Sequence, residues 1–447
     1  MLRNVIQEHL ILPVSDLITG QSVHKYLSFL LKSQYWSREQ LDDFQNEKLR
    51  ELIKYAYDNV PFYHDVMDQC GLVPSDIQTK DDLVKMPIIN KDLIRKEGIE
   101  RFTSKAMPKT KMIKSSSSGS TGEPFTFYIT KLNYSVNLAA NLRGWYGFGW
   151  RLGDKYVKLS QNTRDSKIKK VQDWITRDLY LESRDLSDNN IRGILDRIES
   201  YKPTVVRSYP DPLYFMAKYR LEHKDDYSYC PRIVTTTGNV LHDHVRKLIE
   251  EAFGCEVYDA YASEAGSNVF ECPTHHGYHS SEEYGITEIV DDNNQPITSG
   301  TGRLVTTDLW NYAHPFIRYD VQDVVELDPE PCVCGRVHLH IKRILGRDNE
   351  ILVTSSGKRY IVHHFTYFFE PTKTLQLNNS VDQFQIIQHV DKTVSILLIV
   401  NDRYNEQIAA YIQQYWEKEL ETKVDVQVVD RIPLMHNNKR RFIIIES

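Results

Sequence analysis

The hydrophobic and polar positions of residues 38–59 follow the period of an α-helix. Five apolar side chains recur near the spacing that places residues on one helical face: Leu41, Phe44, Leu49, Leu52 and Ile53. Val60-Pro61 follows directly, and proline disfavours helical geometry in the residue before it. The pattern therefore predicts a helix that ends near residue 59, within a helical region that covers residues 1–110.

The pattern changes between residues 111 and 330, where short β-branched runs alternate with helical stretches such as 241–253. The clearest runs are Val205-Val206, Ile233-Val234-Thr235-Thr236-Thr237 and Val257-Tyr258. Strands interleaved with helices predict an α/β arrangement around a largely parallel sheet. Residues 285–290 and 302–307 flank a turn-rich Asp-Asp-Asn-Asn segment, which predicts a hairpin in a second, antiparallel sheet.

The last hundred or so residues have the pattern of a small α+β unit. Strands are expected at 384–388, 394–400 and 424–429, with a helix near 404–420. The chain is thus divided into a helical region at 1–110, an α/β core at 111–349 and a small unit at 350–447.

Composition places the chain among globular proteins. A chain of 447 residues is too long for one ordinary compact core, so two or three structural units are expected. The net charge of -6 argues against a broad nucleic-acid-binding face, and no apolar run reaches the roughly 18 residues of a membrane span. The N-terminus lacks the pattern of a secretory signal, and six Cys in so long a chain do not make a disulfide scaffold. We therefore expect a cytoplasmic protein.

Small residues are concentrated at 115–124, which read Ser-Ser-Ser-Ser-Gly-Ser-Thr-Gly-Glu-Pro and precede an apparent strand at 125–129. Glycines and small side chains let backbone N–H groups approach a polyphosphate, and hydroxyls add further donors. A flexible linker is the alternative, although linkers seldom carry Thr-Gly-Glu-Pro between two strand-like runs. Because the Gly-Lys-Ser/Thr ending of a Walker A loop is missing, the segment predicts a different phosphate-binding loop.

This segment resembles the phosphate-binding loop of the adenylate-forming superfamily, the acyl-CoA synthetases and their relatives. Phe125 stands where many members have Lys, as in the phenylacetate–CoA ligase branch and its capsule-biosynthesis relatives, which the chain resembles over essentially its whole length. The resemblance implies a large N-terminal adenylate-forming domain with a helical N-terminal region and α/β sheets, and a small mobile C-terminal α+β domain. It also implies ATP-phosphate contacts from Ser117, Ser118, Gly119, Ser120, Thr121 and Gly122.

Residues 258–264, Tyr-Asp-Ala-Tyr-Ala-Ser-Glu, resemble the family's aromatic–Gly–x–Ser/Thr–Glu element. The resemblance implies that Tyr261 packs near adenine, that Ser263 meets the α-phosphate and that Glu264 holds Mg²⁺. A carboxylate beside phosphates suits this cation, which prefers oxygen ligands. The element departs from the family pattern because Ala262 replaces Gly and one residue is missing. A surface Glu after a strand is the alternative interpretation of Glu264.

Two further segments resemble parts of the nucleotide site. Thr237-Gly238 follows a strand and precedes a helix, as does the family's adenine-contacting turn, and open α/β sheets usually bind ligands at such strand ends. Residues 315–323 are similar to the branch's Pro–x–Ile–Arg–Tyr–x–x–x–Asp element, which implies that Asp323 accepts hydrogen bonds from the ribose hydroxyls. For Arg318 in the same element, an internal ion pair and a phosphate contact both remain open.

The C-terminal motifs imply a hinge and a catalytic lysine. Residues 344–350 resemble the hinge, in which Arg347 reaches the ribose or a phosphate and Glu350 takes the place of the pivoting Asp. Residues 435–442 resemble the segment of the adenylation lysine, which implies that Lys439 acts as a catalyst together with Glu264. The alternatives are a solvated basic face and a role for the neighbouring Arg440.

A metal site is predicted from Cys332-x-Cys334-Gly335-Arg336 and an upstream segment that begins at Cys272. Three thiolates and one imidazole form a set that structural zinc prefers. Members of the phenylacetate–CoA ligase branch carry a similar Cys…Gly-x-His followed by Cys-x-Cys-Gly-Arg, which favours His279 over His275 and His276. Four ligands leave no position for a reactive water, so this zinc would brace the fold. Buried reduced thiols are the alternative.

The resemblance therefore implies activation of a carboxylic acid by ATP and Mg²⁺ to an acyl-adenylate, followed by transfer to CoA. An amine acceptor that gives an amide is the main alternative. The sequence does not identify the acid, although Trp145, Tyr146 and Tyr209 fall in regions that could line its pocket. A nucleotide-binding protein without turnover and a zinc-bearing scaffold are the competing classes of function.

Overall fold

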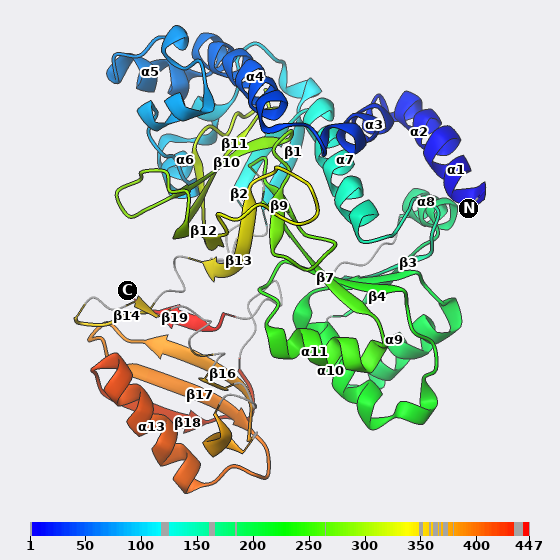
Figure 1. The fold of residues 1–447 in the computed structure, drawn as a ribbon, viewed down its shortest axis with the longest axis vertical. Coiled ribbons are helices and arrows are strands. Elements are labelled where there is room, and N and C mark those ends of the chain that lie inside the picture. The colour runs from blue at the N-terminus through cyan, green and yellow to red at the C-terminus, as the bar shows by residue number, and fades with distance from the viewer. Residues whose placement is uncertain are drawn as a thin grey trace. The chain divides into compact units, whose positions relative to one another are not determined.

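The computed structural model describes residues 2–117, 125–160, 166–183, 186–263, 265–347, 352–356, 359–360, 365, 368–369, 374–378, 380–432 and 441–446 (Figure 1). The contacts divide the chain into a larger unit, whose last segment ends at Ile344, and a smaller unit, whose main segment begins at Leu345. Among the described residues, no helix combines the length and apolar character needed to cross a bilayer.

Helices form the N-terminal part of the larger unit. They are α1 (Leu2–Ile6), a π-helical turn η1 (Gln7–Ile11), α2 (Leu12–Thr19), α3 (Val23–Ser33), α4 (Arg38–Asn59), α5 (Pro61–Gln69) and α6 (Lys91–Glu97). The predicted helix at 38–59 is confirmed as α4. It begins at a capping box in which Ser37 and Gln40 bond each other's backbone N–H groups, and it ends before Pro61. Four of its five predicted apolar positions are fully buried: Leu41, Leu49, Leu52 and Ile53.

One large sheet organises the rest of this unit. Its strands are β3 (Tyr156–Ser160), β4 (Asp178–Glu182), β5 (Val205–Ser208), β6 (Ile233–Thr237), β7 (Glu256–Ala262), β8 (Asn268–Glu271), β9 (Tyr278–Ser280), β10 (Gly285–Val290), β11 (Gly300–Asp308), β12 (Tyr319–Leu327) and β13 (His340–Arg347). Their spatial order is β10-β11-β12-β13-β9-β8-β7-β6-β5-β3-β4. Strands β4, β3, β5, β6 and β7 are parallel, which confirms the predicted α/β arrangement.

Alternating side chains bury both faces of the parallel strands. Val205, Ile233 and Tyr258 pack into the core that includes α7 (Lys131–Gly147). Their neighbours Val206, Val234 and Val257 face a second core. That second core is supplied largely by α9 (Asp188–Tyr201), α10 (Pro210–Glu222) and α11 (Asp243–Phe253). The sheet thus lies between two helical layers, with α8 (Lys167–Thr176) near its β4 edge (Figure 1).

The predicted hairpin at 285–307 is confirmed as the antiparallel pair β10 and β11, but the prediction that it belongs to a second sheet is wrong. Strand β8 pairs antiparallel with β7, and β9 pairs antiparallel with β8 and β13. The backbone hydrogen bonds therefore continue from the parallel strands to the antiparallel ones within a single 11-stranded sheet.

The smaller unit is an α+β fold with its own core. Strands β16 (Val381–Gln388), β17 (Val394–Val400), β18 (Val424–Val428) and β19 (Ile443–Ile445) form a sheet in the order β18-β17-β16-β19, and β14 (Leu352–Val353) pairs with β15 (Arg359–Tyr360). The side chains of α13 (Glu406–Leu420) complete the core, where Trp416 stacks on Phe365 with ring centroids 4.3 Å apart. The three strands and the helix predicted for this unit are confirmed.

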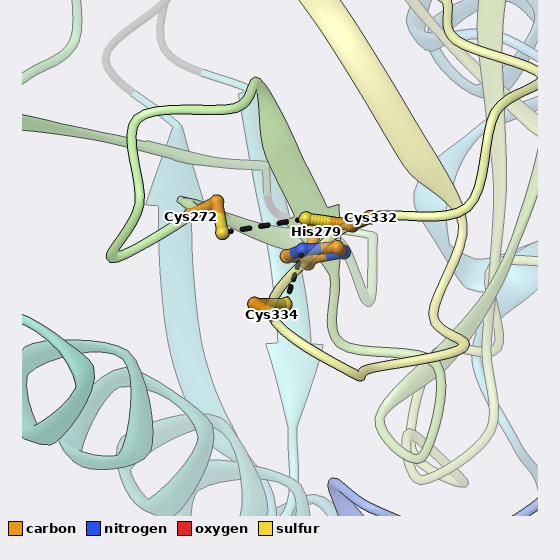
Figure 2. A group of neighbouring side chains, drawn as sticks. All are labelled: Cys272, His279, Cys332 and Cys334. Carbon is orange, nitrogen blue, oxygen red and sulfur yellow. Dashed lines mark hydrogen bonds between the residues drawn. The ribbon is translucent and has the colours of Figure 1, made fainter.

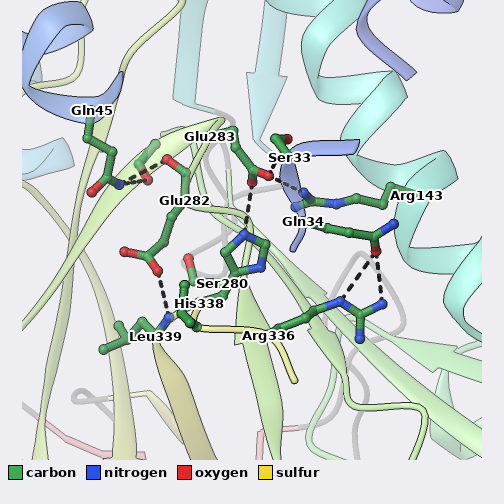
Figure 3. Close-up of polar contacts among 12 residues, drawn as sticks. Ser33, Gln34, Gln45, Arg143, Ser280, Glu282, Glu283, Arg336, His338 and Leu339 are labelled. Carbon is green, nitrogen blue, oxygen red and sulfur yellow. Dashed lines mark hydrogen bonds and ion pairs between the residues drawn. The ribbon is translucent and has the colours of Figure 1, made fainter. Parts of the chain in front are cut away.

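A buried ion cluster joins the N-terminal helices to the sheet (Figure 3). Glu283 accepts hydrogen bonds from Ser33 of α3 at 2.6 Å and from Arg143 of α7 at 2.7 Å. His338 Nε2 lies 3.3 Å from its other oxygen. Burial would raise the pKa of the Glu283 carboxyl, but the charges of Arg143 and His338 outweigh it and hold that pKa well below its usual range. The cluster fixes α3, α7 and the segment before β13 to one point.

Replacing Glu283 by Ala is expected to lower the free energy of unfolding by about 3–5 kcal/mol, because Arg143 is left charged and buried without its partner. Equilibrium urea denaturation measures the change. The matched control is Glu51→Ala, which removes an exposed ion pair with Lys48 and should cost less than about 1 kcal/mol. Equal losses of unfolding free energy in the two variants would contradict the stabilising role of the buried Glu283 cluster.

The pH dependence of this stabilisation follows from the lowered pKa of Glu283. A carboxyl whose folded-state pKa is depressed stabilises fully above the ordinary Glu pKa of about 4.3 and loses this contribution as the pH falls through the folded-state value. The difference between the parent and Glu283→Ala proteins should therefore be constant near neutral pH and shrink only in acid.

Candidate functional site

The carboxyl ends of β5, β6 and β7 bring several predicted residues to one edge of the sheet. In the parallel register Ser208 pairs with Thr236, and Thr237 pairs with Ala260. Thr237 and Gly238 are therefore beside the end of β7, which contains Tyr261 and is followed by Ser263. This is the position at which open α/β sheets bind ligands.

The turn after β6 is shaped by Gly238, which has a φ of +84°. A Cβ atom there would lie 2.4 Å from Cε1 of Tyr209, so the ring of Tyr209 rests directly on this turn. The other two aromatic residues suggested for an acid pocket lie on α7. Tyr146 is buried and donates to Glu8 at 2.7 Å, and Trp145 packs against Trp150 with ring centroids 5.5 Å apart.

A buried carboxylate that the motifs did not single out braces this edge. Asp259 of β7 accepts hydrogen bonds from Thr236 at 2.6 Å and from Tyr278 at 3.1 Å, and burial raises its pKa. It thus ties β6, β7 and β9 together beneath the strand ends. Its only sequence signal is an acidic residue within an apolar strand run.

Asp308 lies against Gly266, in the segment that follows Ser263. It accepts from Asn133 of α7 and from the Trp310 backbone, each at 2.8 Å, and burial raises its pKa to about 7. Gly266 has a φ of +81°, and a Cβ there would lie 2.5 Å from the Asp308 Cα. The chain after β7 therefore approaches β11 more closely than any larger residue would permit.

Several predicted ligands lie outside the described residues: Ser118, Gly119, Ser120, Thr121, Gly122, Glu264, Glu350 and Lys439. Ser117 ends β1 (Ile113–Ser117) and pairs with Phe125 of β2 (Phe125–Ile129), so an antiparallel hairpin flanks the serine-rich segment. Asp323 lies within β12, and Arg347 is the last residue of β13.

The structure resolves the alternatives for Arg318 in favour of an internal ion pair. Its Nη2 lies 2.9 Å from Oε1 of Glu288, and its Nε lies 3.2 Å from both carboxylate oxygens. Nη1 also donates to the Met86 carbonyl at 2.8 Å. Both charged side chains are buried, and the Arg318 guanidinium links Glu288 of β10 to the Met86 carbonyl of the N-terminal region.

The four predicted metal ligands converge (Figure 2). Cys272 Sγ lies 3.5 Å from Cys332 Sγ, and Cys334 Sγ lies 3.2 Å from His279 Nε2. All four ligand atoms are within 4.8 Å of one another, and only Cys334 is not fully buried. Three soft thiols and one imidazole at this spacing suit a tetrahedral zinc ion.

Local geometry explains how the cluster forms. Cys272 follows β8 and His279 lies in β9, so the turn between these strands sets their separation. Gly277 in that turn has a φ of +65°, and a Cβ there would lie 2.5 Å from the Ile341 carbonyl oxygen. Cys332 and Cys334 lie between β12 and β13, where β13 pairs with β9. Sheet pairing thus brings the two halves together.

The other two histidines have different partners. His275 Nδ1 lies 2.9 Å from Glu271, and its ring stacks on Tyr258 with centroids 4.5 Å apart. His276 is exposed and its Nδ1 lies 2.8 Å from the Thr274 carbonyl oxygen.

The protonation states of Cys272 and His279 also suit a divalent metal ion. Burial opposes ionisation of Cys272, but hydrogen bonds from His279 and Thr274 outweigh it and lower the pKa of that thiol to about 5. Burial lowers the pKa of His279. A thiolate and a neutral imidazole are the forms that bind metal ions. Burial raises the pKa of Cys332 to about 12, so a metal ion would have to displace its proton.

Comparison with known proteins gives a consistent picture. Residues 349–446 match the CapK C-terminal domain family. Protein CapK of Staphylococcus aureus is 26% identical over 90% of this chain and 89% of its own length. The phenylacetate–coenzyme A ligase of Thermus thermophilus is 27% identical over 71% of this chain and 72% of its own length.

Among solved structures, 2-hydroxyisobutyryl-CoA ligase in its postadenylation state matches with a TM-score of 0.73 and 16% identity, over 93% of this chain and 91% of that one. This likeness shows the fold, and it confirms the predicted mixed α/β class with a C-terminal domain. The chain is therefore similar over most of its length to protein CapK and to phenylacetate–CoA ligases, and its last hundred or so residues match the CapK C-terminal domain family.

Proposed function

We propose that this chain uses ATP and Mg²⁺ to activate a carboxylic acid as its acyl-adenylate and then transfers the acyl group to CoA. The observation that carries the proposal is the meeting of Thr237, Gly238 and the Tyr261–Ser263 segment at the carboxyl ends of parallel strands. The similarity to phenylacetate–CoA ligases supports the choice of reaction.

The proposed chemistry follows from the poor reactivity of a carboxylate. Attack by its oxygen on the ATP α-phosphate releases pyrophosphate and forms a mixed anhydride with AMP as leaving group. The protein must hold two anions together and neutralise charge as the pentavalent phosphorus forms. We assign charge neutralisation to the 115–122 loop and Lys439. Glu264 would hold Mg²⁺, which supplies charge stabilisation at the phosphates. Asp323 and Arg347 would bind the ribose, with Arg347 alternatively at a phosphate.

The second half-reaction replaces AMP by a nucleophile. CoA is the acceptor that we propose, and an amine that yields an amide is the alternative. Rotation of the smaller unit near Glu350 would withdraw Lys439 after adenylation and admit the acceptor.

We also propose that Cys272, His279, Cys332 and Cys334 hold a structural zinc ion. Their spacing and burial support this assignment, because four protein ligands complete a tetrahedral site. The ion would link the β8–β9 turn to the segment between β12 and β13. Reduced thiols at such a site fit a reducing compartment, and the cytoplasm remains the location that we propose.

Replacing Lys439 by Ala should reduce acid-dependent ATP–pyrophosphate exchange by about 10²–10³-fold, because a charge that stabilises the transition state is lost. The exchange assay is run with a panel of carboxylic acids. Arg440→Ala is the matched neighbour and should retain most activity. Full exchange in Lys439→Ala would refute its role, and absence of exchange by the parent protein with every acid would refute adenylation.

Mass spectrometry of the products then identifies the acceptor. With a competent acid, ATP and CoA, an acyl-CoA thioester and AMP are expected. If only supplied amines are acylated, the reaction is amide formation and the proposed CoA transfer is wrong.

The zinc proposal predicts about one zinc ion per chain by elemental mass spectrometry of the purified protein. Cys272→Ser and Cys334→Ser should lose most of the metal and unfold at lower temperature, because the apoprotein keeps buried thiols without their bridging ion. Cys230→Ser changes an exposed cysteine outside the cluster and should keep the metal. Unchanged zinc content in both cluster variants would overturn the assignment.

A further inference from the structure

The N-terminal helical segment presents its apolar side chains to solvent. Helices α1, η1 and α2 are continuous, with helical backbone angles at Ile6 and Ile11 where they join. Its buried side chains include Gln7 and Asp16, whereas Leu17 is 84% exposed. An ordinary surface helix has the opposite polarity, with its apolar stripe turned towards the core. This arrangement leaves hydrophobic side chains that the described part of the chain does not cover.

Helix α8 extends this surface. Gln7 donates to the Ile175 carbonyl at 2.7 Å, which holds α8 beside the N-terminal segment (Figure 1). On α8, Trp174 is 80% exposed, and Val171 is exposed as well. We define the apolar face as seven residues of these helices that are each more than half exposed: Leu2, Val5, Leu10, Leu17, Ile18, Val171 and Trp174. A cluster of this kind marks an interaction surface.

A cationic groove adjoins the apolar face. The groove has a volume of about 790 Å³ and is bordered by α8, the edge strand β4 and the start of α1. Arg3 and Trp174 both line it, so the groove and the apolar face share a border. Its five cationic side chains are Arg3, Lys155, Lys170, Arg177 and Arg197. These exceed its three carboxylates, from Asp173, Asp178 and Glu182, and leave a net positive groove on a chain whose net charge is -6.

We propose that the apolar face docks on the surface of an anionic lipid membrane, with its hydrophobic side chains in the boundary between headgroups and acyl chains and the cationic groove against lipid phosphates. Amphipathic helices that carry exposed Leu, Ile and Trp beside basic residues bind membranes in this way without crossing them. Trp is suited to this depth because its ring is apolar and its N–H is polar. The positive groove complements the negative surface of such a membrane.

The charge pattern distinguishes this partner from a second copy of the chain. A twofold interface places the same surface on both partners, so a twofold contact whose axis passes near the shared border would bring two cationic grooves towards each other. Like charges brought together disfavour that contact, whereas an anionic bilayer is attracted by the same charges.

Flotation of the full-length protein with vesicles tests the proposal. We expect binding to vesicles of phosphatidylcholine mixed with phosphatidylglycerol, much weaker binding to phosphatidylcholine alone, and a decrease with added salt. The double variant Leu17→Glu/Ile18→Glu should bind more than tenfold more weakly, because two apolar side chains no longer enter the bilayer. Lys170→Ala should weaken binding about fivefold.

Val390→Glu is the control for an added carboxylate, since it places one Glu at an exposed valine of the smaller unit and should bind like the parent. Thermal unfolding of each variant checks that the fold is intact, as expected for changes at exposed positions. Equal binding by the parent and the double variant would overturn the proposal. Absence of vesicle binding by the parent protein would also overturn it. So would a dimer that forms without lipid and dissociates in the double variant, because the apolar face would then be an interface between copies of the chain.

Discussion

The larger unit depends on one continuous set of backbone hydrogen bonds that changes from parallel to antiparallel at the pair β7 and β8. On one side of this pair, parallel strands align their carboxyl ends and create the edge where Thr237 and Gly238 lie. On the other side, the antiparallel strands return the chain and bring Cys272 and His279 close together. The candidate nucleotide edge and the thiol cluster are thus consequences of the same sheet.

Much of the fold could be predicted because local signals agree with the final packing. The helix at 38–59 has an apolar face and a stop at Pro61, and both operate as expected. The single sheet could not be predicted, because the strand pairing of residues 278–279 with 340–341 is a long-range contact without a local pattern. Apolar and polar side chains alternate in residues 285–307 as in any hairpin. This alternation is the same whether the hairpin extends one sheet or starts another.

In the candidate site as well, residues within local motifs could be predicted from the sequence, whereas partners that meet only in the folded protein could not. The order of the motifs suggested the nucleotide residues, and strand register explains why Thr237 and Tyr261 are neighbours. Arg318 could not be assigned from its motif, because its partner Glu288 is thirty residues earlier and becomes adjacent only in the folded sheet. His279 was favoured by resemblance, and its place in β9 supplies the physical reason.

Strand direction also separates the two chemical centres. Because β8 runs antiparallel to β7, Asn268 pairs with Ala262 at the carboxyl edge, and Phe270 pairs with Ala260. Cys272 follows two residues beyond Phe270, towards the amino end of β7. Along the strands, two residues separate Cys272 from the level of Thr237 and four separate it from the level of Ala262, about 7 Å and about 13 Å at roughly 3.3 Å per residue. A metal ion held by the cluster would therefore be too distant to touch a phosphate bound at the edge. This separation favours a bracing role for the cluster, independently of the number of its ligands.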